Sequence, residues 1–254
     1  MCIRDRFRRT EFLEVDGYGR FEAYANRNSL KYQNIYGLEN IETLYRGTIR
    51  RVGFSKAWQI FVALGMTDDS YVIEDSEAMS YRDFINSFLP YSPSDSVELK
   101  LRHQLKIDQD DILWDKLKEL DLFNALKKVG LKNATPAQIL QKILMDSWSL
   151  KQADKDMIVM YHKFGYELSG KKHQIDATMV CIGENQTYTA MAKTVGLPVA
   201  IATLMVLNNE IKLKGVKIPI ENSIYKPILK ELEDFGITFH EKDVNYLGYN
   251  NLNT

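Results

Sequence analysis

The sequence predicts a mixed α/β fold in which strand-rich segments at both ends bracket a helical segment. Near the N-terminus, short apolar runs flank Asp16-Gly17-Tyr18-Gly19, a pattern typical of two strands joined by a tight turn. Further along, two longer runs flank Ser169-Gly170-Lys171, which predicts a β-hairpin. Between them, Thr135-Pro136-Ala137-Gln138 combines a capping residue, a first-turn proline and a capping-box glutamine, so a helix is expected to begin there.

These signals predict a discontinuous α/β domain with a mixed sheet, residues 11–53 and 155–254, and an all-helical insertion, residues 54–154. Strands are expected at residues 12–15, 21–24, 43–52, 157–166, 173–182 and 237–240. Outside the insertion, helices are expected at residues 30–35, 189–208 and 227–236.

The first residues of the chain do not fit this pattern. Met1 to Arg6 match neither a signal peptide nor a capped helix. They resemble translated adapter read-through, so residues 1–10 are predicted to be a non-native leader, and the natural N-terminus is then expected to be missing. The alternative is an ordinary frayed, basic terminus.

Composition is that of a globular protein. Of the 254 residues, 45% are hydrophobic, and the formal net charge is -1. That balance argues against a nucleic-acid partner, because dedicated nucleic-acid binders carry a basic surplus. The two cysteines, Cys2 and Cys181, form neither a disulfide framework nor a metal-ligand spacing. We therefore expect a cytoplasmic protein without a metal site.

The most apolar run of the sequence is residues 194–207. It is shorter than the roughly 20 residues that span a membrane, and Pro198 lies near its start. We therefore expect a buried helix and no membrane partner.

The densest cationic cluster near the N-terminus is Arg46, Arg50 and Arg51. If residues 43–52 form a strand, Arg46, Thr48 and Arg50 share one face and Arg51 points away. Arg46 and Arg50 would then lie roughly 13 Å apart, a spacing suited to two carboxylates of one extended ligand, which arginine binds bidentately. The alternative is an edge strand whose charges are solvated and block aggregation.

The turn that precedes this strand is a second candidate for anion binding. Asn28 or Ser29 can cap the following short helix, and helix-start amides beside Arg27 would attract an anion. An ordinary cap with an exposed arginine is an equally good interpretation.

Other reactive side chains give weaker signals. The four histidines do not pair at metal-ligand spacing. Cys181 lies in an apolar strand, which indicates an inert core thiol. Lys193 is expected on a partly buried helix face, where a functional role is one of two open interpretations.

Five strings of residues, taken in order, resemble signatures of the glutamate-forming saccharopine dehydrogenase family. Ala25-Asn-Arg-Asn-Ser29 resembles the family's Pro-Asn-Arg-Asp-Ser turn, and Arg46-Gly-Thr-Ile-Arg50 resembles its Arg-Gly-Thr-Leu-Arg strand. The other three are Asp156-Met-Ile-Val-Met160, Ala190-Met-Ala-Lys-Thr-Val-Gly-Leu-Pro198 and Tyr225-Lys-Pro-Ile-Leu229. The resemblance runs from about Leu13 to Glu241, nearly the whole chain.

The resemblance implies an oxidoreductase of lysine metabolism. Saccharopine, a lysine and a glutamate that share one nitrogen, would be oxidised at a C–N bond, with hydride transfer to NAD or NADP. Water would then release glutamate and 2-aminoadipate 6-semialdehyde. In this family the cofactor is bound by an N-terminal Rossmann-like domain, which we expect to be missing, because Gly17-Tyr18-Gly19 lacks the third glycine and the following helix of a dinucleotide fingerprint.

The family's substrate contacts map onto this sequence residue by residue. Arg27 matches the saccharopine-binding arginine of the turn, and Thr48, Ile49 and Arg50 match the substrate-contacting residues of the strand. Saccharopine bears three carboxylates, so its site needs several fixed cations. Arg27 and Arg50 are therefore the expected carboxylate clamps, with Arg46 as a supporting residue.

Two positions depart from the family pattern. Asn28 replaces an aspartate and Ala25 replaces a proline. The turn is expected to stay capped, because Asn and Asp cap similarly, but loss of the charge could loosen the orientation of Arg27. The family's acid–base candidates lie upstream, so the catalytic residue is unknown from this sequence.

We therefore expect the substrate-side portion of the enzyme, inactive alone and a homodimer when full-length. Two alternatives stay open. One is a relative that acts on a polyamine precursor such as carboxynorspermidine, which has fewer carboxylates. The other is a non-catalytic binding or dimerisation fragment.

Overall fold

The computed structural model describes residues 7–26 and 28–248, and the chain forms two compact units. Among the described residues, the helical unit consists of residues 7–14, 18–25 and 50–149, and the sheet unit of residues 15–17, 26, 28–49 and 150–248. The predicted α/β class with a mixture of strands and helices is confirmed. The predicted domain limits, 54–154 within 11–53 and 155–254, stay a prediction.

Residues 1–6 of the predicted leader lie outside the described residues. Phe7 is described, and its ring meets that of Tyr24 edge-on, with 4.9 Å between centroids. Residue 7 is therefore packed against the core rather than frayed.

The first sheet has the strand order β1-β2-β3. Its strands are Thr10–Val15, Gly19–Ala25 and Gly47–Arg51. Gly17 and Gly19 have φ of 80° and 81° in the turn between β1 and β2, a backbone region that favours glycine. The predicted strands at 12–15 and 21–24 are confirmed, whereas the predicted strand 43–52 is shorter than expected.

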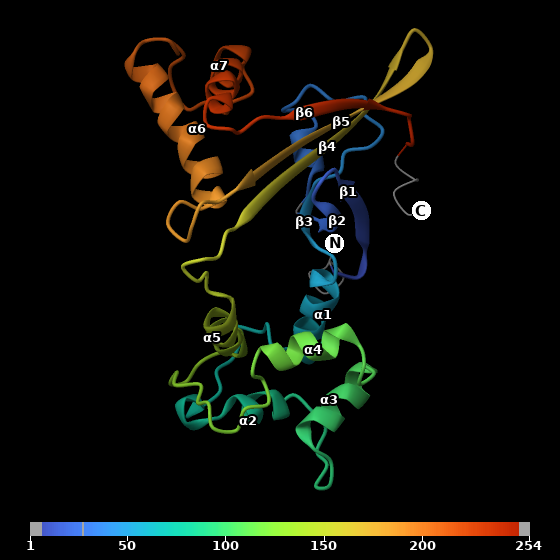
Figure 1. The fold of residues 1–254 in the computed structure, drawn as a ribbon, viewed down its shortest axis with the longest axis vertical. Helices are drawn as coiled ribbons and strands as arrows, with labels where there is room; N and C mark the ends of the chain where they lie inside the picture. The colour runs from blue at the N-terminus through green and yellow to red at the C-terminus, as the bar shows by residue number, and fades with distance from the viewer. Residues whose placement is uncertain (1–6, 27, 249–254) are drawn as a thin grey trace. The chain divides into compact units, whose positions relative to one another are not determined.

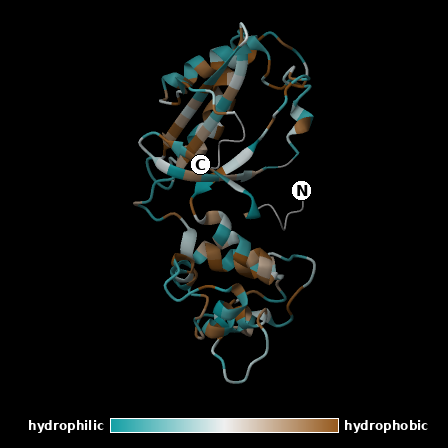
Figure 2. Ribbon diagram, turned by 90° about the vertical axis from the view of Figure 1, so that its right-hand side faces the viewer, coloured by the Kyte–Doolittle hydropathy of each residue, from teal (hydrophilic) through white to brown (hydrophobic). Residues whose placement is uncertain are grey.

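The helical unit is built from short helices around one apolar core. Figure 1 shows α1 (Phe54–Leu64), α2 (Tyr81–Asn86), α3 (Val97–Leu105), α4 (Ile112–Glu119) and α5 (Pro136–Trp148). Tyr81, Phe61 and Phe84 are among its fully buried side chains, and Figure 2 shows apolar residues concentrated along these helices. The predicted capping box is confirmed: Gln138 N donates to Thr135 Oγ1, and Thr135 N donates to Gln138 Oε1.

A buried carboxylate from β2 fixes the start of α1. Glu22 is 3% exposed, and its two oxygens accept hydrogen bonds from the amides of Gly53 at 2.9 Å and Ser55 at 2.5 Å. Backbone amides at a helix start have no partner within the helix, and a negative charge there is also favoured by the helix dipole. Glu22 therefore joins β2 to α1.

We predict that Glu22→Ala destabilises the protein by roughly 2 kcal/mol, because two amides lose a charged acceptor. Glu22→Gln keeps one acceptor oxygen and should cost about 1 kcal/mol. Urea denaturation followed by circular dichroism measures both. Equal stability of wild type and Glu22→Ala would show that the contact contributes nothing.

The sheet unit contains a long antiparallel sheet of order β4-β5-β6. Its strands are Met157–Leu168, Lys171–Ile182 and His240–Val244. Ser169 and Gly170 have φ of 52° and 75°, so the predicted hairpin is confirmed. The predicted strand 237–240 is wrong, because Ile237 joins the core and the strand that pairs with β5 begins at His240.

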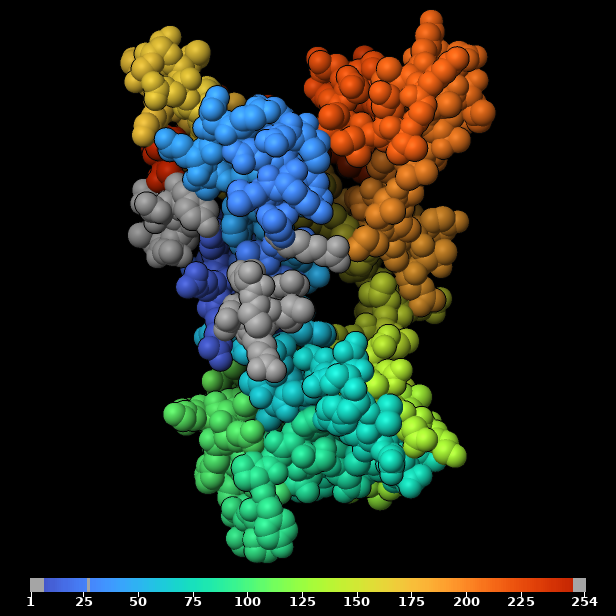
Figure 3. All heavy atoms as spheres, turned by 180° about the vertical axis from the view of Figure 1, so that it is seen from behind, coloured from blue at the N-terminus to red at the C-terminus, as the bar shows by residue number. Residues whose placement is uncertain are grey.

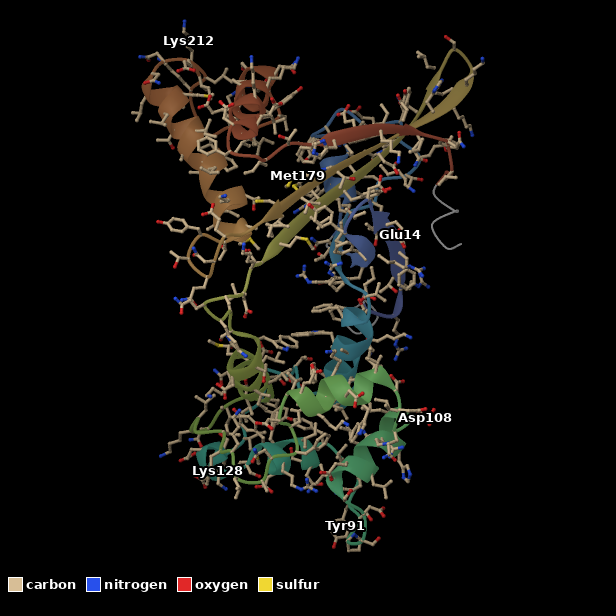
Figure 4. The ribbon with its side chains drawn as sticks, in the orientation of Figure 1. Glu14, Tyr91, Asp108, Lys128, Met179 and Lys212 are labelled. Atoms are coloured by element: carbon tan, nitrogen blue, oxygen red, sulfur yellow. The ribbon has the colours of Figure 1, made fainter. Side chains whose placement is uncertain are left out.

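Two helices pack with this sheet: α6 (Ala190–Leu207) and α7 (Asn222–Glu233). In Figure 1 they lie beside each other next to the sheet. Their core includes Met179, which Figure 4 labels on β5, together with Ile201 and Ile228. The predicted start of the second helix at Pro227 is wrong, because α7 begins at Asn222 and holds Pro227 in its interior.

Asp156 ties α6 to both long strands. Its carboxylate accepts hydrogen bonds from the amides of Ala190 at 2.6 Å and Met191 at 2.9 Å, and its carbonyl accepts one from Gly183 at 2.9 Å. A Cβ on Gly183 would lie 2.1 Å from the Asp156 carboxylate, so this junction requires glycine. Thr189 caps the same helix by accepting from Ala192, as the predicted start implies.

The expectation that α6 is a buried helix is wrong within the sheet unit. Only one side of α6 packs against α7, β4 and β5, and its buried residues are Ala190, Ile201 and Met205. Val195 and Val199 are 60% and 64% exposed, and Figure 3 shows α6 and α7 in orange at the surface. By length and composition alone α6 could cross a membrane, with a hydropathy of 1.8 over 18 residues, but one such helix is weak evidence of a span.

We predict opposite outcomes for an aspartate at two positions of α6. Ile201→Asp should cost about 3 kcal/mol or more, because it buries a charge in the core. Val199→Asp should change stability by less than about 0.5 kcal/mol, because its side chain faces solvent. Thermal denaturation of both variants tests this, and comparable losses would mean that the Val199 face is covered.

His162 on β4 gives the sheet unit a pH dependence. Its ring stacks on Phe164 at 5.9 Å and lies 5.4 Å from Phe239. Burial lowers the pKa of His162 below its usual 6.5, because the charged form loses solvation. As the pH falls, His162 therefore takes up its proton at a higher pH in the unfolded chain than in the folded protein.

We predict that wild type loses stability relative to His162→Phe when the pH falls from about 7.5 to about 5.5. The loss begins near the unfolded pKa and is complete below the depressed folded pKa. Urea denaturation of both proteins at the two pH values measures it. A stability difference that does not change with pH would contradict the assignment.

Candidate functional site

The strand predicted to carry the cationic cluster begins later than expected. β3 runs from Gly47 to Arg51, so Thr48 and Arg50 share a strand face, but Arg46 precedes the strand. The predicted common face stays a prediction for Arg46, which lies one residue before the strand. β2 ends at Ala25, and strand-forming residues stay irregular where no partner strand remains.

The two arginines of β3 lie over aromatic rings. The Arg51 guanidinium lies 4.4 Å from the Phe21 ring centroid and donates to the carbonyl of Tyr18 at 2.7 Å, which is a structural role. The Arg50 guanidinium lies 5.3 Å from the Phe54 centroid and is exposed. Of the two, Arg50 is thus the better placed to meet a ligand.

A backbone hydrogen bond closes the loop between β2 and β3. The amide of Asn26 donates to the carbonyl of Arg46 at 2.9 Å. This bond brings the two ends of residues 26–46 together within the sheet unit, and Figure 3 shows this segment in blue at the surface. A cavity of about 280 Å³ opens there, and its described lining residues are Asn26, Lys31, Tyr32 and Arg46.

The charge in this pocket, defined by those four residues, is cationic. The Arg46 guanidinium lies 4.3 Å and the Lys31 ammonium 5.5 Å from the Tyr32 ring centroid. Tyr32 is itself stacked on Tyr36 at 5.9 Å, which holds the ring. Among the described residues, no carboxylate lines the cavity, and neither Lys31 nor Arg46 forms an ion pair. The arrangement can therefore accept an anion.

The remaining predicted site residues are not among the described residues that line this pocket. Arg27 falls outside the described residues. Thr48 and Ile49 are half-buried on β3. Sequence reasoning missed Lys31 and Tyr32, although their place in the short helix after the Asn-rich turn was a usable signal.

The predicted helix-start anion site is not supported. The helix after the turn is a 3-10 segment of three residues, Leu30–Tyr32, and Ser29 makes no side-chain cap. The Leu30 amide donates to Asn28 Oδ1 at 3.1 Å. The amide expected to attract an anion is thus already satisfied, and side chains supply the positive charge.

The weaker candidates have structural roles. Lys193 forms an ion pair with Glu184 at 2.7 Å, which raises the pKa of Lys193. Cys181 is 7% exposed, and burial raises the pKa of its thiol, as expected for an inert core cysteine. In residues 7–26 and 28–248, His, Cys, Asp and Glu form no group of three that could hold a metal ion.

A second cavity, of about 380 Å³, lies in the helical unit. Its lining includes Trp58, Leu140, Leu144, Met145 and Trp148, and its described lining residues carry no charge. The rings of Trp58 and Trp148 are 6.4 Å apart. This apolar cavity does not suit a ligand with several carboxylates.

The glycines around Tyr18 do not form a dinucleotide-binding turn. Gly17 lies in the turn between β1 and β2 and Gly19 is the first residue of β2, so a strand follows rather than the helix whose amides bind a pyrophosphate.

The described residues thus form a mixed α/β fold in which the loop between β2 and β3 carries a small cationic pocket. The profile of the saccharopine dehydrogenase C-terminal domain family matches residues 3–237. The chain belongs to this family.

Relatives support the assignment over most of the chain. The mitochondrial alpha-aminoadipic semialdehyde synthase of Rattus norvegicus is 35% identical over 225 residues, which are 86% of this chain and 24% of that protein. The saccharopine dehydrogenase [NADP(+), L-glutamate-forming] of Saccharomyces cerevisiae is 32% identical over 240 residues, 90% of this chain and 52% of that protein.

The fold is similar to a solved structure as well. The apo, histidine-tagged saccharopine dehydrogenase (L-Glu forming) of Saccharomyces cerevisiae matches with a TM-score of 0.83 and 28% identity, over 94% of this chain and 55% of that chain. The chain thus spans between about a quarter and about half the length of these relatives.

Proposed function

We propose that this chain is the saccharopine-binding portion of a saccharopine dehydrogenase that yields glutamate and 2-aminoadipate 6-semialdehyde in lysine metabolism. The observation that carries the proposal is the position of the cations. Arg50 is exposed on β3, and Arg46 lines a cationic pocket together with Lys31. The names of the relatives supply the substrate.

The chemistry of the substrate matches these side chains. Saccharopine carries three carboxylates, and guanidinium groups bind carboxylates through two parallel hydrogen bonds. Thr48 adds a hydroxyl on the same strand face as Arg50. We assign Arg27 and Arg50 as the main carboxylate clamps, with Thr48 and Ile49 as contacts and Arg46 as a supporting residue.

The proposed overall reaction is oxidation of the C–N bond on the lysine side of saccharopine. A hydride leaves the lysine-side carbon to NAD or NADP, the shared nitrogen loses its proton to solvent as the imine forms, and water hydrolyses the imine. The name of the yeast relative specifies NADP. A strand, not a helix, follows the turn at Gly17, so the turn lacks the helix start that binds a pyrophosphate, and the proposed task of the described residues is to bind and orient saccharopine. A homodimer and a cytoplasmic location stay predictions.

We predict that saccharopine binds this chain and that Arg50→Ala weakens binding about tenfold or more, because a bidentate carboxylate contact is lost. Arg50→Lys should recover only part of the affinity, since an ammonium lacks the planar fork. Isothermal titration calorimetry with saccharopine measures all three. Lys56→Ala, which removes an exposed charge from α1, is the matched control and should bind like wild type.

Unchanged saccharopine affinity in Arg50→Ala would contradict the assigned clamp. Selective binding of carboxynorspermidine would favour a polyamine-precursor enzyme, and no binding of either compound would favour a non-catalytic fragment.

In the same series, the chain incubated with saccharopine and NAD or NADP should form no reduced cofactor. Its formation would refute the proposed division of labour.

A further inference from the structure

The pocket formed by Asn26, Lys31, Tyr32 and Arg46 contains an electrostatic imbalance. Two cations approach one aromatic ring, at 4.3 Å and 5.5 Å from its centroid. The ring attracts each of them through its negative face, but the two positive charges also repel each other. In salt-bridged clusters a carboxylate relieves such repulsion, and none of the described lining residues supplies one.

We infer that this pocket is a carboxylate subsite in which Arg46 and Lys31 hold one terminal carboxylate of the substrate. The inference rests on the proposed function for the identity of the substrate, but the subsite itself rests on the pocket. It adds Lys31 and Tyr32 to the site and gives Arg46 a direct contact with ligand.

Stacking defines what each side chain contributes. Tyr32 holds the Arg46 guanidinium against its ring, so the fork loses less freedom when it binds a carboxylate. Tyr32 is in turn stacked on Tyr36. Lys31 adds a point charge with flexible geometry, and Asn26 completes the described lining. Arg46 should therefore account for more of the affinity than Lys31.

The size and the donors of the pocket favour a carboxylate over a phosphate. The pocket is small, about 280 Å³, and presents one planar fork beside one ammonium. Phosphate sites in proteins commonly use several backbone amides at a helix start, and the Leu30 amide of this loop is already satisfied by Asn28.

The test uses glutarate and inorganic phosphate as separate probes of the 254-residue chain, with binding followed by calorimetry and by NMR shifts of residues 26–46. Glutarate should bind more tightly than phosphate, and added salt should weaken it. Arg46→Gln should weaken glutarate binding about tenfold or more, Lys31→Gln about threefold, and Tyr32→Leu about threefold through loss of stacking.

Lys172→Gln is the matched control. Lys172 also lies over a tyrosine ring, 5.4 Å from the Tyr246 centroid, but does not line this pocket. This variant should bind glutarate like wild type. Arg46→Lys keeps the charge and should retain intermediate affinity, so a folding defect in Arg46→Gln, seen by circular dichroism, would not leave the question open.

The outcomes separate this inference from the proposed function. Glutarate binding that is unchanged in both Arg46→Gln and Lys31→Gln would overturn the subsite, and tighter binding of phosphate than glutarate would overturn its carboxylate assignment. Saccharopine binding that depends on Arg50 but not on Arg46 or Lys31 would overturn the subsite alone. Glutarate binding that depends on Arg46, without saccharopine binding, would support the subsite and refute the proposed substrate.

Discussion

The candidate site depends on one backbone hydrogen bond, from the Asn26 amide to the Arg46 carbonyl. β2 ends one residue before this bond and β3 begins one residue after it. The bond therefore converts the residues between them into a closed loop whose two ends are fixed beside each other. Closing a loop of this length costs only a few kcal/mol of entropy, and the strand pairing on one side of the bond offsets it. The pocket exists because both ends of the loop contribute to its lining.

Two carboxylates also join segments that are distant in the sequence, in each case at the start of a helix. Glu22 accepts hydrogen bonds from backbone amides at the start of α1, and Asp156 accepts them from backbone amides at the start of α6. In each case a carboxylate more than 30 positions earlier in the sequence caps the helix, with separations of 31 and 33 residues for Glu22 on β2 and of 34 and 35 for Asp156, which directly precedes β4. Such contacts fix where a helix begins relative to its sheet. They cannot be predicted from local sequence, because the acceptor and the donors meet only through the tertiary fold.

Local signals were sufficient where the determining residues are close in sequence. The capping box at Thr135 and the hairpin at Ser169 need only neighbouring residues, and both were predicted correctly. The prediction of strand at residues 43–46 failed because β-propensity is realised only against a partner strand, and β2 ends at Ala25. The prediction that α6 is buried failed for a related reason. Hydrophobicity indicates that a surface needs covering but not what covers it. The site was predicted in part, since Arg46 lies in the pocket while Lys31 and Tyr32 were recognised only from their shared cavity.

The arginines of this region show why residue type alone does not assign a role. The Arg51 guanidinium lies over the Phe21 ring and donates to the backbone carbonyl of Tyr18, so the fold already uses part of its hydrogen-bonding capacity. Arg46 has a ring, which orients a guanidinium but accepts no conventional N–H hydrogen bond, and it shares its pocket with a second cation. Stacking leaves the guanidinium edge available, and the edge is the part that recognises a carboxylate. The distinction between a structural and a ligand-binding arginine therefore lies in whether the fold supplies its acceptors or leaves them to be supplied by a ligand.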